Sequence, residues 1–206
     1  MTNMIDVDRP ALQARVTNIL KDPKREWPVI AAEATTTEKL YSSYIVPLAA
    51  IPVIANFIGT SIIGVSLPFV GTYRVPMISG LVAAFVTYVV SLVMVYVAAM
   101  IVDKLAPTFE STSNQIQALK LVAYSYTASW VAGVLSVFPV LFPLVFLASL
   151  YTIYLFYTGL PVLMKTPESK VVPYMVVSAV VMIGLAILVG MFTAAFVGVA
   201  GPVYPS

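Results

Sequence analysis

The side chains that could do chemistry in this sequence are hydroxyls, aromatic groups and one amide that lie inside apolar segments. The third apolar segment holds most of them and the first holds the amide: Tyr124, Ser125, Tyr126, Thr127, Ser129 and Trp130, and Asn56. Such side chains can line a path for a polar solute or bind a lipid headgroup, and in membrane proteins they commonly form hydrogen bonds between helices. We favour helix contacts and keep a solute or ligand path as the alternative.

The composition excludes most other chemistry. The 206 residues include no Cys and no His, so the chain cannot form a disulfide, a thiolate nucleophile, a Cys/His metal site or an imidazole base. It also has neither a Walker loop nor a G-x-G-x-x-G turn for nucleotides. We therefore expect no catalytic residue, no metal and no cofactor. A net charge of +2 gives no electrostatic basis for a nucleic-acid partner.

The elements that position these side chains are predicted to be membrane helices. The chain is 60% apolar and 10% charged, whereas soluble domains are about 45–50% apolar and about 25% charged. Its charges leave uncharged runs of 34, 28, 44 and 36 residues. About 20 apolar residues cross a bilayer core, so the 44-residue run can hold two spans. We expect an all-α polytopic membrane domain over residues 40–199 with five transmembrane helices, at about 40–64, 77–102, 116–137, 141–159 and 173–199.

The orientation follows from the positive charges. With five spans, the polar arm of residues 1–39 shares a side with two of the loops, and this side carries ten of the eleven Lys and Arg residues. Lys and Arg accumulate on the cytosolic side of membranes. The sequence therefore predicts a cytosolic N-terminus, an external tail over 200–206 and a bacterial inner-membrane location. Arg74 is the one external charge, which we interpret as a side chain reaching water from the interface, with a binding role as the alternative.

The arm is expected to contain amphipathic, interfacial helices. An apolar stripe at helical spacing predicts a helix lying on the membrane surface: Leu12, Val16, Ile19 and Leu20. Asp22 and Pro23 can start a second helix, in which Trp27 would lie at the level of the lipid headgroups.

Prolines and glycines predict where the spans bend and end. Pro47 and Pro52 lie inside the first span and predict helix bends. Gly159 and Pro161 predict the end of the fourth span.

Several sequence blocks occur together in a known family. They are Asp22-Pro23, Glu26-Trp27 and Glu33 in the arm, Leu40-Tyr41, Tyr44-Ile45 and Pro47 in the first span, Tyr124-Ser125-Tyr126-Thr127 with Ser129-Trp130, and Gly159-Leu160-Pro161-Val162-Leu163-Met164-Lys165-Thr166-Pro167. Over about residues 20–198 the chain resembles the bacterial branch of the Yip (Ypt/Rab-interacting protein) domain family. The resemblance implies five membrane helices, a cytosolic N-terminus and an external C-terminus. It makes Pro161, Met164, Lys165, Thr166 and Pro167 a cytosolic loop motif.

Two further expectations come from the resemblance. Eukaryotic relatives are associated with Rab GTPases and form hetero-oligomers with one another, so a GTPase partner enters here only by analogy. At Ala128 the family motif has Pro, and its loss predicts a straighter third span.

Two functions fit these features. The first is a non-enzymatic membrane organiser that forms homo-oligomers, or joins related membrane proteins, within the lipid bilayer. Its basis is that the charges gather on the inner side while the spans lack ionisable groups, apart from Lys120 at the edge of the third span. The alternative is a channel or facilitator for a small uncharged solute, with Asn56 and the hydroxyls of the third span along its path.

Overall fold

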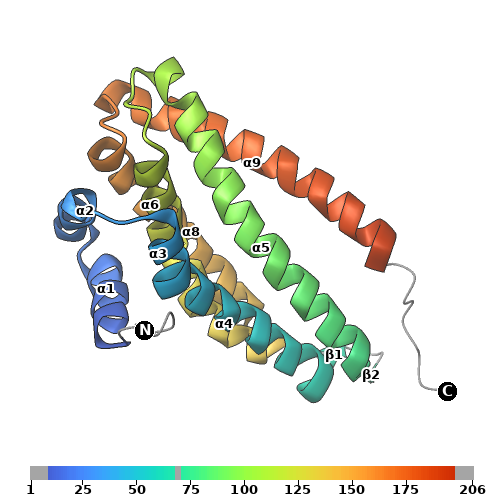
Figure 1. The fold of residues 1–206 in the computed structure, drawn as a ribbon. Helices are drawn as coiled ribbons and strands as arrows, with labels where there is room; N and C mark the ends of the chain where they lie inside the picture. The colour runs from blue at the N-terminus through green and yellow to red at the C-terminus, as the bar shows by residue number, and fades with distance from the viewer. Residues whose placement is uncertain (1–8, 68–70, 198–206) are drawn as a thin grey trace, which may run out of the picture.

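A computed structural model describes residues 9–67 and 71–197, and it is a bundle of long helices with a helical arm at one end (Figure 1). The arm consists of α1 (Arg9–Lys21) and α2 (Pro23–Ala32). We call the end of the bundle where these helices pack the arm end. The predicted external tail, residues 200–206, lies outside the described residues.

Within the described part of the chain, four helical stretches are long and apolar enough to cross a membrane: Thr37–Ile63, Met77–Phe109, Phe142–Leu163 and Glu168–Leu185. The first is built from α3 (Thr37–Leu40), η1 (Tyr41–Ile45), α4 (Val46–Phe57) and η2 (Ile58–Ile63). The second is α5 (Met77–Leu105), which continues into η3 (Ala106–Phe109). The others are α8 (Phe142–Leu163) and α9 (Glu168–Val197). The predicted helical membrane protein is confirmed at this level.

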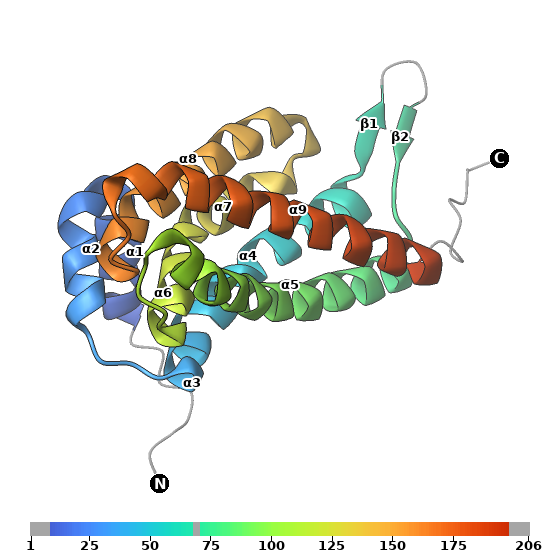
Figure 2. The ribbon, with the colours of Figure 1, turned by 90° about the horizontal axis from the view of Figure 1, so that it is seen from above.

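The segment between the first two spans forms a small antiparallel hairpin of β1 (Val65–Leu67) and β2 (Gly71–Tyr73). Val65 pairs with Tyr73, and Leu67 pairs with Gly71. The hairpin projects from the end of the bundle opposite the arm (Figure 2). We call this end the hairpin end.

The predicted third span is interrupted, and the expectation that it would be straighter without a proline is wrong. Its residues form α6 (Gln115–Ser125), α7 (Thr127–Ala132), η4 (Gly133–Val137) and η5 (Pro139–Leu141). The α-helix stops at Tyr126 and tightens to a 3-10 helix from Gly133. The tightening has a packing reason, because the backbone at Gly133 lies directly against the ring of Pro52. A tertiary contact therefore shapes this segment despite the missing proline.

The interrupted segment nevertheless runs the length of the bundle. Just before it begins, the Thr112 amide donates to the Met164 carbonyl over 2.8 Å, in the loop that joins α8 to α9. Near its end, the Ser136 carbonyl oxygen lies 2.4 Å from where a Cβ at Gly59 would stand. Gly59 belongs to η2, which leads into the hairpin. The segment therefore connects the arm end to the hairpin end.

The fourth predicted span, 141–159, ends later than expected. Helix α8 includes Pro161 and continues to Leu163. The Met164 amide donates to the Leu160 carbonyl over 3.0 Å, and Lys165 then takes a left-handed conformation with φ of 53°. A proline removes one backbone donor without ending a helix that packing holds in place, so Gly159 and Pro161 do not stop it.

The core lies at the arm end. Its largest fully buried side chains include Trp27, Tyr174, Ile19, Ile30, Ile45, Leu119, Leu121, Leu155, Leu160 and Met164. Large apolar side chains nearer the hairpin end are exposed, for example Ile78 at 80%, Phe85 at 69% and Phe142 at 68%. An exposed apolar surface of this extent is expected of helices that face lipid.

Candidate functional site

The polar residues of the third span make contacts between helices. Tyr124, Ser125, Thr127 and Trp130 are buried. The Thr127 hydroxyl shares a buried 2.7 Å hydrogen bond with the Tyr44 hydroxyl, and the ring of Tyr44 packs on that of Tyr124 at 4.5 Å between centroids. These contacts join α6 and α7 to the π-helical turn η1 of the first span.

The other polar residues of this cluster face different neighbours. The Ser129 hydroxyl shares a 2.7 Å hydrogen bond with the Thr152 hydroxyl of α8. The ring of Tyr126 stacks on Trp130 at 5.9 Å. The Ser125 hydroxyl is buried and has no hydrogen-bond partner among the described residues.

Asn56 does not join the cluster. It lies twelve residues beyond Tyr44 in the first span, which corresponds to about 18 Å along a helix. Its side chain is exposed, and its carbonyl accepts from the Thr60 hydroxyl over 2.8 Å. The amide and the third-span hydroxyls are therefore separated along the bundle axis.

The two prolines that predict bends in the first span lie in different surroundings. Pro47 is the second residue of α4, which begins at Val46 directly after the π-helical turn η1. A π-turn shifts the backbone hydrogen bonds by one residue, and a proline lacks the donor for an ordinary one. Pro52 lies inside α4, against Gly133.

Arg15 is the centre of an ionic cluster in the arm. Its guanidinium forms ion pairs with Glu26 and Glu33 of the arm and lies 5.9 Å from the ring centroid of Tyr124. Burial alone would lower the pKa of Arg15, but the charges of Glu33 and Glu26 raise it above the ordinary arginine value. Arg15 therefore stays charged and links the arm to α6 by a cation–π contact.

Lys120 and Gln117 of α6 hold the C-terminal end of α2. The Lys120 ammonium group donates to the carbonyls of Ile30 over 2.8 Å and of Glu33 over 2.5 Å. The Gln117 amide donates to the Ala31 carbonyl over 3.0 Å. The last carbonyls of a helix lack partners within it and carry a partial negative charge. A buried cation on the bundle therefore caps the arm helix.

Trp27 is fully buried, so its expected position among lipid headgroups is wrong. Its indole nitrogen donates to the Thr158 hydroxyl over 3.0 Å. A Cβ at Gly159 would lie 2.7 Å from the indole ring, so only glycine leaves room for it. The apolar stripe of α1 likewise packs on protein, with Ile19 fully buried.

The predicted loop motif is partly structural. Met164 and Thr166 are buried, and Thr166 accepts from the Ser111 hydroxyl over 2.8 Å. Lys165 is exposed. The Pro167 carbonyl accepts from the Lys170 amide at the start of α9 over 2.8 Å. The motif thus fixes the α8–α9 turn and presents one lysine to solvent.

Arg74 lies after the hairpin and is exposed, and its Nε donates to the Ile63 carbonyl over 3.3 Å. This bond satisfies a carbonyl at the end of η2.

Comparisons with known proteins identify the family of this chain. The Yip1 domain matches residues 17–191. The chain belongs to the Yip1 domain family. Inner membrane protein YohC of Escherichia coli strain K12 is 31% identical over 147 residues, which cover 71% of this chain and 73% of YohC, and YohC of E. coli O6:H1 strain CFT073 matches equally. No solved structure matches the chain.

The Yip resemblance drawn from the sequence blocks is thus confirmed, and in this Yip1-domain protein the blocks meet at the arm end. Trp27 of the arm block fits against Gly159 of the α8 block. The Tyr44 hydroxyl of the first span shares a hydrogen bond with the Thr127 hydroxyl of the third. Arg15, Gln117 and the role of Lys120 were missed because the contacts that join the arm to α6 connect residues far apart in sequence.

Proposed function

We propose that this Yip1-domain protein is a non-enzymatic organiser of the bacterial inner membrane. It crosses the bilayer five times, keeps its arm in the cytosol and uses the surface at the arm end to bind neighbours. Those neighbours are anionic lipids and other membrane proteins, including further copies of the chain. The observation that carries the proposal is the arm itself, which is built into the bundle through Trp27, Arg15 and the Lys120 cap.

Five crossings are supported by where the interrupted segment begins and ends. The bond from Thr112 to Met164 holds the loops before α6 and after α8 together at one end. A chain that crossed only four times would separate these two loops by the thickness of the membrane. The broken segment of 115–137 is the fifth crossing, with its interruption covered by neighbouring helices, as the bilayer requires.

The docked arm gives the arm end a fixed, charged surface. Exposed basic side chains from the arm, the start of the first span and both loops lie on it: Lys21, Lys24, Arg25, Lys39, Lys104 and Lys165. Basic residues next to a membrane are attracted to anionic lipids by about 1 kcal/mol each. Deeper in the bundle, the hydroxyls of Thr127 and Ser129 form hydrogen bonds with other helices of the same chain, which fits a role in helix packing better than one in solute passage.

Single cysteines test the topology cleanly, because the natural chain has none. We expect a membrane-impermeant maleimide to label Arg74→Cys in intact spheroplasts. Lys24→Cys, Ser113→Cys and Ser169→Cys should be labelled only after the membrane is opened. Labelling of Ser113→Cys and Ser169→Cys from opposite sides would rule out five crossings.

Photo-crosslinking in native membranes tests whether the arm end binds neighbouring proteins. A photoreactive residue at Lys24 or Lys104 should give discrete adducts, including one at the mass of two chains, whereas one at the lipid-facing Phe85 provides the matched control. Monomer alone at both basic positions would contradict the proposal. Glycerol flux into reconstituted vesicles that disappears with Thr127→Val would instead favour the solute path.

A further inference from the structure

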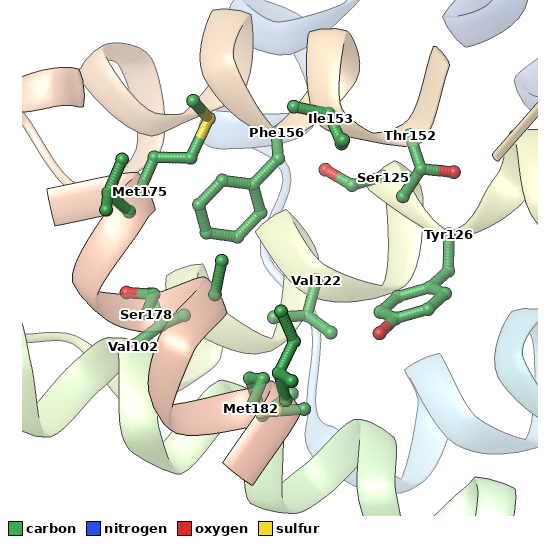
Figure 3. Close-up of a pocket in the computed structure, with 14 residues that line it drawn as sticks. Val102, Val122, Ser125, Tyr126, Thr152, Ile153, Phe156, Met175, Ser178 and Met182 are labelled. Atoms are coloured by element: carbon green, nitrogen blue, oxygen red, sulfur yellow. The ribbon is translucent and has the colours of Figure 1, made fainter. Parts of the chain in front are cut away.

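A cavity of about 330 Å³ lies between α5, α6, α8 and α9, next to the third-span cluster (Figure 3). Its walls are almost entirely apolar, with Val102 of α5, Val122 of α6, Phe156 of α8 and Met182 of α9 among them. This volume is at the lower end of the range for small-molecule sites, about 300–1,000 Å³. The neighbouring helix contacts described above do not fill it.

Two hydroxyl groups in the cavity wall have no partner within the described part of the chain. Ser125 is 1% exposed and Ser178 is 3% exposed, and neither hydroxyl oxygen has a hydrogen-bond partner among the described residues. In Figure 3 the Ser125 hydroxyl points toward Ile153 and Phe156 of the facing helix. A buried hydroxyl left unpaired is energetically unfavourable, so an occupant that offers an oxygen acceptor would relieve that cost.

The residues at the rim of the cavity indicate that it opens toward lipid. Ile153, Val176 and Ile183 line it and are 52%, 50% and 60% exposed, so they also form part of the apolar outer surface that faces lipid. The cavity reaches Val102, which adjoins Asp103 at the polar end of α5, and follows α9 from Met175 to Ile183. Those nine residues span about 12 Å of helix. The space therefore extends from the polar arm end into the hydrocarbon region.

We infer that this cavity binds a single acyl chain of a membrane lipid, with the ester carbonyl oxygen accepting a hydrogen bond from the Ser125 hydroxyl. The apolar walls bind the methylene groups, and Ser178 offers a second donor on the opposite helix. An ester fits because it is uncharged, accepts hydrogen bonds and lies at the junction of polar and apolar lipid. The site is a lipid-binding site within the bundle, separate from the charged surface at the arm end.

The test uses two photoreactive probes of equal chain length, a diazirine-labelled methyl palmitate and a matching diazirine hydrocarbon. The full chain is reconstituted in vesicles of phosphatidylethanolamine and phosphatidylglycerol, and adducts are mapped by mass spectrometry. We expect the ester probe to label Phe156, Met175 and Met182 at least fivefold above the lipid-facing Phe85. Unlabelled methyl palmitate should remove this excess.

Variants distinguish the contribution of the apolar cavity from that of the two serine hydroxyl groups. Ser125→Ala combined with Ser178→Ala should reduce the excess labelling by the ester probe severalfold and leave that by the hydrocarbon unchanged. The control Ser149→Ala, on a half-buried side chain of α8 that does not line the cavity, should change neither. Ala179→Phe, at the cavity rim, should abolish labelling by both probes, whereas the adjacent Val180→Phe should not. Labelling no greater than at Phe85, or a loss in the double serine variant that is equal for both probes, would overturn the inference.

Discussion

Replacing Lys120 by Met should release the arm from the bundle without unfolding it. Lys120 is 2% exposed and its ammonium group donates to two carbonyls at the end of α2, those of Ile30 and Glu33. Met has a similar length and an apolar side chain, so the substitution keeps the packing against α6 while removing both donors. The carbonyls then lack partners whenever the arm is docked.

The expected loss can be worked out from these two bonds. A hydrogen bond from a charged donor is worth about 1.5–3 kcal/mol, so two of them give a gross loss of about 3–6 kcal/mol. Desolvation of the buried ammonium offsets part of this, which favours the lower end, about 3 kcal/mol. Since 1.4 kcal/mol is tenfold in an equilibrium constant, the undocked population of the arm should rise roughly a hundredfold.

Hydrogen exchange in lipid nanodiscs measures this population directly, because amides exchange when their segment opens. In Lys120→Met, amides of α2 should exchange roughly a hundredfold faster, while those of α5 and α8 stay protected. Gln117→Met loses one neutral bond and should give less than a tenfold change, and Lys104→Met, on an exposed lysine, should give none. Unchanged protection of α2 would refute the capping role, and faster exchange throughout the bundle would show that Lys120 supports the whole fold.

Two further variants test helix packing, one toward the arm end and one toward the hairpin end. Tyr44→Phe leaves the buried Thr127 hydroxyl without its partner and should lower the free energy of unfolding by about 1–3 kcal/mol, seen as a lower thermal midpoint in detergent. Gly59→Ala places a Cβ 2.4 Å from the Ser136 carbonyl oxygen and should cost about 1–3 kcal/mol. Gly184→Ala meets nothing within 4 Å and serves as its control, and an equal loss in both glycine variants would contradict the close approach at Gly59.

Predictions from local sequence differ from the structure at helix ends and interruptions. Pro161 suggested a stop, yet α8 continues to Leu163 because its last turn is packed between the arm and α9. Ala128 suggested a straight third span, yet the segment is broken at Tyr126 and tightened near Pro52. In both cases the local propensity is a small energy, and tertiary packing outweighs it.

The functional surface was predictable only in part. The sequence placed Tyr124 and Thr127 among polar residues of one span, but the partners that give them a role, Tyr44 and Arg15, lie on other elements. Trp27 was expected at the level of the lipid headgroups, but in the structure it lies in the interior of the protein.

The sequence by itself determined that this is a helical membrane protein of the Yip1 family, because hydropathy and charge act locally and every backbone polar group in lipid must be satisfied within its own helix. Only the tertiary structure decided that the arm is part of the bundle. Lys120 reaches Ile30 across 90 positions of sequence, and Trp27 reaches Thr158 across 131. Such contacts depend on how complete helices pack, and a small residue such as Gly159 acquires its role only when the ring of Trp27 lies against it.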